Sequence, residues 1–212
     1  MTLVEQIEAK AAQLANDCMG GTAKPDECLT SLFVQLEEAA SEHLTRLSIL
    51  APPPTPLHCK PGCSSCCKTG AVQLTPPEAL FLLGIIETCG FRYAVTLAAR
   101  SSARPGCPLL DQQGGLCRFY AHRPLMCRAM NSLDVAECHK CEGGEGMDVP
   151  LWLPHYETYA RVQSGMSASL AKKGKAMPVL SLRKVLALET SAPLLWEEWL
   201  QGANPFKAAL AG

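Results

Sequence analysis

Cysteine is the residue whose distribution most restricts how this chain can fold. Ten of its 12 cysteines lie between Cys59 and Cys141. Thiols gathered in this way indicate either a disulfide framework or a metal site, and the redox compartment decides between the two. The N-terminal sequence MTLVEQIEAKAAQ has neither the basic nor the apolar segment of a secretory signal. We therefore expect a cytoplasmic protein whose thiols stay reduced, and the cluster favours metal binding.

The overall composition excludes several other functions. The chain has 212 residues and is 48% hydrophobic, which is enough to form a core that does not need disulfide bonds for stability. Its formal net charge of −1 gives no general attraction to nucleic acid. The longest apolar run, residues 79–86, is far shorter than the ~20 residues that a membrane span needs. Metal ions are thus the expected partners. A protein partner is compatible with the sequence, and the oligomeric state is left open.

Hydrophobic periodicity in residues 1–50 predicts a helical hairpin. Leu3, Ile7 and Leu14 share one helix face, and Gly20 with the following glycine ends that helix. A second helix begins near Pro25, with apolar residues repeating at helical spacing up to position 47. Cys18 extends the first apolar stripe and Cys28 borders the second. Both are expected to be small core residues rather than metal ligands.

The rest of the chain also favours helices, which are separated by irregular segments. A proline-rich connector at 51–56 precedes the first cysteines, and Thr75 with Glu78 forms a capping box that opens a helix ending near Gly90. Further helices are expected at 91–104, near 125–130, and at 155–173, 181–190 and 193–201. We predict a mostly α fold, an irregular helical domain around a cysteine-rich metal centre. Residues 1–50 form its N-terminal hairpin and residues 51–212 the metal-binding part with C-terminal helices.

The cysteines between positions 59 and 141 fall into three elements. The first is CKPGCSSCC, the second has three cysteines spaced ten residues apart, and the third is a CxxC knuckle. Cys89 lies far from all of them in sequence and is expected to be structural. The candidate metal ligands are Cys59, Cys63, Cys66, Cys67, Cys107, Cys117, Cys127, Cys138 and Cys141. Because Cys66 and Cys67 are adjacent, their side chains should diverge. Either one of them supports the site from outside, or two centres lie side by side.

These motifs resemble the small bacterial and archaeal CxxCxxCC proteins, also called YkgJ-type zinc- or iron-chelating domains. The resemblance covers residues 58–132 and rests on the quartet ending in Cys66-Cys67, on the CPLL element at Cys107, and on CRFYAHRPLMCR from Cys117. It implies that Cys63, Cys66, Cys67, Cys107, Cys117 and Cys127 are family positions. Cys59 departs from the family spacing by one residue. A related domain occurs in a flagellin lysine methylase that looks like an iron–sulfur protein, so the resemblance also implies a cluster-dependent enzyme as one alternative.

The number of thiols bears on the identity of the metal. One tetrahedral zinc or one four-iron cluster uses four cysteines, and nine candidates exceed that. Ligands gathered from scattered segments favour a [4Fe–4S] centre with a redox, metal-handling or modification role. A zinc-stabilised interaction module without catalysis is the alternative. Cys59, Cys63 and Cys66 also have the spacing of a radical S-adenosylmethionine motif, but the helical pattern that follows argues against that class.

Three arginines recur five residues apart among the cysteines of the second element. Arg118, Arg123 and Arg128 match family positions, and residues 51–131 carry 8 basic against 3 acidic side chains. One interpretation is that these arginines bind the cofactor by donating hydrogen bonds to cluster sulfur or to a bound anion. The other is that they balance charge and anchor loops. Neither interpretation decides whether the protein is an enzyme.

Overall fold

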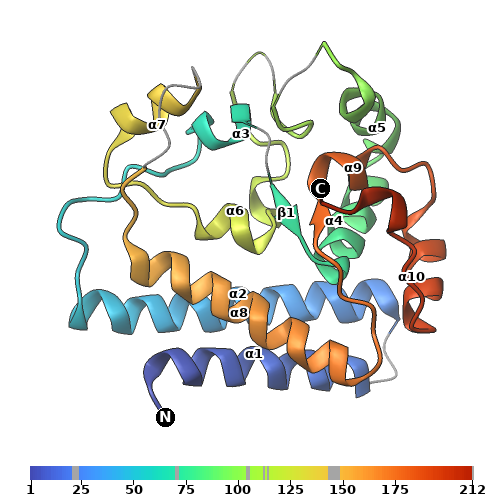
Figure 1. The fold of residues 1–212 in the computed structure, drawn as a ribbon, viewed down its shortest axis with the longest axis horizontal. Helices are drawn as coiled ribbons and strands as arrows, with labels where there is room; N and C mark the ends of the chain where they lie inside the picture. The colour runs from blue at the N-terminus through green and yellow to red at the C-terminus, as the bar shows by residue number, and fades with distance from the viewer. Residues whose placement is uncertain are drawn as a thin grey trace.

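The chain folds into helices joined by irregular segments (Figure 1). The computed structural model describes residues 1–20, 24–69, 72–103, 106–111, 113, 115–142 and 149–211, without the side chains of residues 25, 26, 141 and 142. The helices are α1 (Leu3–Gly20), α2 (Pro25–Leu50), α3 (Ser65–Thr69), α4 (Pro76–Thr88), α5 (Arg92–Arg100), α6 (Leu125–Ala129), α7 (Val135–Glu142), α8 (Leu153–Lys172), α9 (Leu182–Leu186) and α10 (Ala192–Leu200). The strands are β1 (Gln73–Leu74) and β2 (Leu180–Ser181), and the single 3₁₀ turns are η1 (Tyr120–His122) and η2 (Lys207–Ala209). The prediction of a mostly helical fold is confirmed.

Helices α1, α2 and α8 run side by side along one side of the molecule (Figure 1). The two N-terminal helices form the expected hairpin, and α8 packs against both of them. The contact between α1 and α8 is very close at Gly165, where an added Cβ would lie 2.1 Å from the backbone oxygen of Glu8. Only a glycine allows the two backbones to approach this closely. The N-terminal hairpin is thus held to the C-terminal half of the chain.

The cysteines of the hairpin differ from expectation. Cys18 and Cys28 form a disulfide, with their Cα atoms 5.5 Å apart, so the prediction of two ordinary small core residues was wrong. Cys18 lies in the last turn of α1 and Cys28 in the first turn of α2. An antiparallel hairpin brings these two turns together, close enough for a disulfide. The expectation that cytoplasmic thiols stay reduced argued against such a bond.

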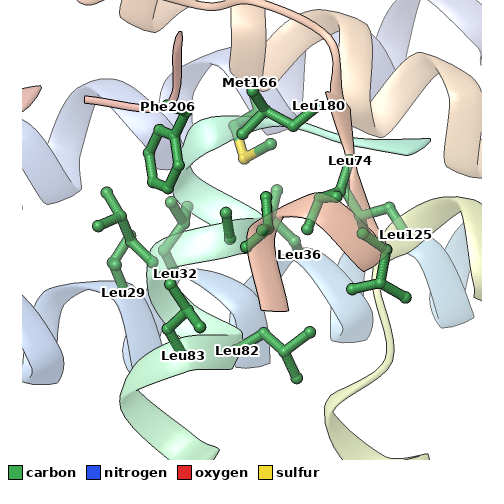
Figure 2. Packing of buried hydrophobic residues seen from close by; sticks show 14 of the residues in the cluster. Leu29, Leu32, Leu36, Leu74, Leu82, Leu83, Leu125, Met166, Leu180 and Phe206 are labelled. Atoms are coloured by element: carbon green, nitrogen blue, oxygen red, sulfur yellow. The ribbon is translucent and has the colours of Figure 1, made fainter. Parts of the chain in front are cut away.

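The core lies between α2, α4, α8 and the two short strands (Figure 2). The two strands pair antiparallel, with Leu74 opposite Leu180, and both leucines are buried. The side chains that fill this region are large and apolar: Leu29, Leu32 and Leu36 from α2, Leu82 and Leu83 from α4, Leu125 from α6, Met166 from α8, and Phe206 near the C-terminus. This packing fixes α4, whose N-terminal end lies beside α6.

A buried carboxylate connects α4 to α6 and α8. Glu78 is 2% exposed and forms the expected capping box with Thr75, whose amide and hydroxyl both donate to it. Gln163 of α8 donates to the same oxygen, Oε2, at 2.9 Å, and the other oxygen, Oε1, accepts a hydrogen bond from the amide of Leu125 at 2.8 Å. Leu125 is the first residue of α6, which carries Cys127. The position of that cysteine therefore depends on a carboxylate in the core.

The cysteine-rich segments gather at the end of the molecule remote from α10 (Figure 1). There α3 packs against α7, and the expected short helix near 125–130 is α6. Neither α3 nor α7 was predicted, and the expected helix at 181–190 is reduced to α9 after the unpredicted strand β2. Within the described residues, no helix combines the length and apolar character that crossing a membrane requires.

Replacing Gly165 by alanine should destabilise the protein by about 2–3 kcal/mol, because the new methyl group forces α1 and α8 apart. Urea unfolding followed by circular dichroism measures this change. Gly84→Ala is the matched control, since Gly84 is also helical and has no atom within 4 Å of an added Cβ. It should stabilise α4 by roughly 0.5–1 kcal/mol. Equal effects of the two substitutions would contradict the close approach.

Glu78 should make stability depend on pH. Burial raises the pKa of Glu78 above its usual 4.5, although the hydrogen bonds from its neighbours oppose this shift. A raised folded-state pKa means that the contribution of Glu78 is complete below the unfolded pKa and is lost as the pH rises through the folded pKa. The difference in unfolding free energy between the wild type and Glu78→Gln should therefore fall as the pH is raised above 4.5.

Urea titrations at a series of pH values measure this difference. The Glu78→Gln substitution itself should lower the free energy of unfolding by about 1–3 kcal/mol. The NH₂ group of the new glutamine would face N–H and O–H donors that now bind the carboxylate oxygens, and it cannot accept from them. Glu38→Gln, on the exposed side of α2, is the control and should change neither the stability nor its pH profile. A constant difference across the pH range would refute the role of Glu78.

Candidate metal centre

Four cysteines from three segments line one cavity at the end of the molecule. The cavity measures about 160 Å³, and the four, here called the cavity thiols, are Cys59, Cys63, Cys66 and Cys138. The turn that carries Cys63 is closed by its amide, which donates to Lys60 O at 3.0 Å, with Gly62 at φ 93°. Cys66 lies on α3 and Cys138 on α7. The first and third cysteine elements of the sequence thus meet at this cavity.

A second group of cysteines lies on the inner side of α3. This group, here called the inner thiols, consists of Cys67, Cys107, Cys117 and Cys127. Cys107 is buried, and the other three are partly buried. The amide of Cys107 donates to Cys67 O at 2.6 Å, and an antiparallel bridge pairs Cys117 with Leu110, close to Cys107 in sequence. Backbone contacts thus bring the loop of Cys107 and Cys117 to α3, although these cysteines lie 40 and 50 residues after Cys67 in the sequence.

Gly106 allows Cys107 to approach α3. Its φ is +83°, and an added Cβ would lie 2.8 Å from Cys67 O and 2.9 Å from Lys68 O. A side chain would meet both a strained backbone conformation and a direct clash. The carbonyl of Gly106 also accepts a hydrogen bond from Arg183. The glycine therefore positions the loop against α3 and with it the hydrogen bond between Cys107 and Cys67.

Cys66 and Cys67 stand at the boundary between the two groups. The pKa of Cys66 is lowered to about 7, mainly by a hydrogen bond from Cys67 and further by the charge of Arg123. The same contact raises the pKa of Cys67. The two thiols therefore affect each other's pKa.

Burial keeps most of the other thiols protonated in the absence of metal. Cys59 is exposed as a residue, but the surrounding protein partly desolvates its thiol and raises its pKa to about 11, with Cys63 among the nearby thiols that add to the effect. Burial likewise raises the pKa of Cys107 to about 11 and raises that of Cys127 still further. Since the thiolate is the form that binds metal, loading such a site releases protons.

The comparisons with known proteins bear on these cysteines. Residues 58–144 match the model of the CxxCxxCC family, whose description is a putative zinc- or iron-chelating domain. The match agrees with the family that the cysteine motifs of this part of the chain resemble. The matched range contains both thiol groups, and the match supports metal binding by this part of the chain. No curated protein and no solved structure matches the chain significantly.

The predicted ligands of the CxxCxxCC domain differ in how they are placed. Eight of the nine belong to the cavity thiols or the inner thiols. The side chain of Cys141 lies outside the described part of the chain, although its backbone belongs to α7. Among the described residues, no three cysteine, histidine or acidic side chains are arranged so that they could hold a metal ion as they stand. Cys89 is exposed at the end of α4 and belongs to neither group.

The three arginines of the CxxCxxCC domain have different surroundings. Arg123 lies over the Tyr120 ring at 3.6 Å, and its charge also reaches Cys66 and Cys117. Arg128 instead pairs with Glu37 of α2 at 3.1 Å, and its Nε donates to the carbonyl of Arg123.

Arg118 lies 3.7 Å from Asp111 and is half exposed. Of the three arginines, Arg123 is thus the one for which the described contacts support a role beside the thiols. The contacts of Arg118 with Asp111 and of Arg128 with Glu37 anchor loops instead.

Several residues around the cavity were not singled out from the sequence. Asn131 is buried, and its side chain accepts from the Trp152 amide at 2.8 Å and donates to Ala129 O at 3.0 Å. Ser132 closes a turn with Asp134, and its backbone oxygen accepts from the amide of His58. These contacts hold the wall of the cavity in place. Their only sequence signal is a short polar pair, Asn131-Ser132, directly after α6.

Gly106→Ala should lower the metal content of the anaerobically purified protein by at least half, because the new side chain pushes Cys107 away from Cys67. Elemental analysis and far-ultraviolet circular dichroism together separate loss of metal from loss of fold. Gly174→Ala is the control: it has φ +76° but no atom within 4 Å of an added Cβ. Gly174→Ala introduces the same strain of a positive φ but no clash with other atoms, so this variant should keep its metal. Equal loss in both variants would contradict the assigned role of Gly106.

Proposed function

We propose that this protein holds an iron–sulfur cluster, [4Fe–4S], in the cavity lined by the cavity thiols, and that it serves as a cytoplasmic redox protein. The observation that carries the proposal is the convergence of Cys59, Cys63, Cys66 and Cys138 on one cavity. Four cysteine thiolates are the usual ligand set of a [4Fe–4S] cluster. The match to a zinc- or iron-chelating family supports a metal at this place.

The size of the cavity favours a cluster over one ion. Its volume of about 160 Å³ is roughly five times the ~30 Å³ that one water molecule occupies in the liquid. A single zinc ion needs its four sulfurs gathered around one point, at about 2.3 Å from the metal. A cluster holds its cysteine ligands apart because the iron and sulfide atoms lie between them. Sulfurs spread around a cavity therefore suit the cluster better.

The surroundings of the cavity suit electron transfer. Cys59 and Cys66 are exposed, whereas Cys138 is buried and its sulfur donates to Asp134 O. A cluster held here would lie near the surface and supply one-electron chemistry. Four cysteines also satisfy all four irons, which leaves no open iron for a substrate. This favours a redox role over the cluster-dependent enzyme that resembles the methylase.

Anaerobic purification followed by Mössbauer and optical spectroscopy tests the proposal. The wild type should show the signature of a [4Fe–4S] cluster. Cys138→Ser should lose the cluster of the cavity, because a buried ligand is removed. Cys89→Ser is the matched control, since it also removes a thiol but lies outside both groups, and it should keep the wild-type spectrum. A colourless protein with stoichiometric zinc and no iron would refute the proposal.

A further inference from the structure

A second cavity opens at the end of the molecule that carries α10, between the start of α2, helix α4 and helix α10 (Figure 1). Its volume is about 580 Å³, and it is here called the α10 pocket. Among the described residues, none lines both this pocket and the cavity of the thiols. Lys24, Leu29, Ala192 and Trp196 line the α10 pocket and lie outside residues 58–144, so the match to a chelating domain does not account for it.

The wall of the α10 pocket is mostly apolar and carries two aromatic rings. Leu29 and Leu80 contribute aliphatic side chains, and Phe81 and Trp196 contribute the rings. Phe81 is held in place by stacking on Phe33 of α2, with the ring centroids 4.7 Å apart. Small-molecule sites in proteins have volumes of roughly 300–1,000 Å³ and predominantly apolar, aromatic walls. The size and the lining therefore both suit a small apolar ligand that contains a ring.

The charged side chains of the α10 pocket balance one another. Glu87 is already occupied, because its Oε1 accepts a hydrogen bond from the amide of Ala192 at 2.9 Å and lies 3.6 Å from Nε of Arg92. The other charged side chains of the described lining are Lys24 and Glu197, which are exposed and of opposite sign. A ligand with a net charge would be attracted by one of them and repelled by the other. The pocket therefore favours an uncharged ligand.

One hydrogen-bond donor of the wall has no partner. The indole N–H of Trp196 is buried and has no acceptor among the described residues. The indole N–H of Trp199, which also lies on α10, instead donates to Ala176 O at 2.7 Å. A buried donor without an acceptor raises the free energy of the protein, and a ligand that brings an acceptor oxygen would remove this cost. A ketone or ether oxygen meets this requirement without adding charge.

We propose that the α10 pocket binds an uncharged, apolar ring compound that carries an acceptor oxygen, with its ring against Phe81 and Trp196 and its oxygen on the indole N–H of Trp196. This inference goes beyond the proposed metal centre and holds whichever metal that centre binds. Gly84 of α4 lines the pocket and has no atom within 4 Å of an added Cβ. A larger side chain at this position would therefore occupy the space that the ligand needs.

Fluorescence titration of the full chain with Prodan tests the proposal. Prodan is an uncharged naphthalene with a ketone oxygen, and its emission shifts to the blue in apolar surroundings. The wild type should bind it saturably, one molecule per chain, with a blue-shifted emission. Gly84→Leu should weaken binding by roughly tenfold or more, because the leucine fills the pocket. Thr45→Leu is the matched control, since it adds the same side chain at an exposed position of α2 outside the pocket, and it should bind Prodan as the wild type does.

A second pair of measurements tests the role of the indole N–H. Trp196→Phe removes the donor and keeps an aromatic ring in the wall. It should weaken the binding of Prodan by roughly three- to tenfold, the loss expected for one hydrogen bond. The same variant should leave unchanged the affinity for N-phenyl-1-naphthylamine, an uncharged ring probe without an acceptor oxygen. An unchanged affinity of Trp196→Phe for Prodan would overturn the assigned contact with the ligand oxygen.

Three further results would overturn the proposal. The first is the absence of saturable binding, or equal affinities of Gly84→Leu and the wild type. The second is tighter binding of the anionic probe 1-anilinonaphthalene-8-sulfonate than of Prodan, which would exclude an uncharged ligand. The third is a loss of Prodan binding as the protein concentration rises, which would show that a second copy of the chain covers the pocket. If circular dichroism shows that Gly84→Leu does not fold, Thr88→Trp, at an exposed lining position of α4, narrows the same pocket and should weaken binding in its place.

Discussion

The metal-binding end of this protein depends on one buried carboxylate. Glu78 accepts hydrogen bonds from its own N-cap, from the start of α6 and from Gln163 of α8. A carboxylate in the core is tolerated only when its oxygens have partners, so these elements must meet at the same place. This meeting fixes α6, and α6 presents Cys127 to the inner thiols. The core and the site are therefore parts of one network rather than separate units.

The long helices could be predicted from the sequence because their apolar residues repeat at helical spacing and their ends carry clear signals. The capping box of Thr75 and Glu78 and the positive φ of Gly90 are examples. Helices α3 and α7 are too short to display a period, and tertiary packing of one against the other forms them. The two-residue strands likewise have no local signal and exist because Leu74 and Leu180 are buried together.

The sequence predicts which cysteines are candidate metal ligands, but it does not predict which of them lie together in the fold. Cysteine spacing identifies which thiols are candidates for metal binding. It cannot reveal that the loop of Cys107 reaches α3, because this depends on Gly106, whose role becomes visible only when Cys67 O is placed beside it. The pairing of Cys18 with Cys28 was missed for a related reason. Both contacts are made between elements, and periodicity reports only on the elements themselves.

The disulfide and the thiol groups make opposite demands on the surroundings of this protein. The Cys18–Cys28 bond joins the ends of α1 and α2, at the opposite end of the hairpin layer from α3 and α7 (Figure 1). An environment reducing enough to keep the metal-binding thiols available also favours opening this bond, and an oxidising one preserves the bond but threatens those thiols. Because α8 holds both hairpin helices, the fold has a second restraint on α1 when the bond is open. The disulfide can thus open without α1 separating from the rest of the protein.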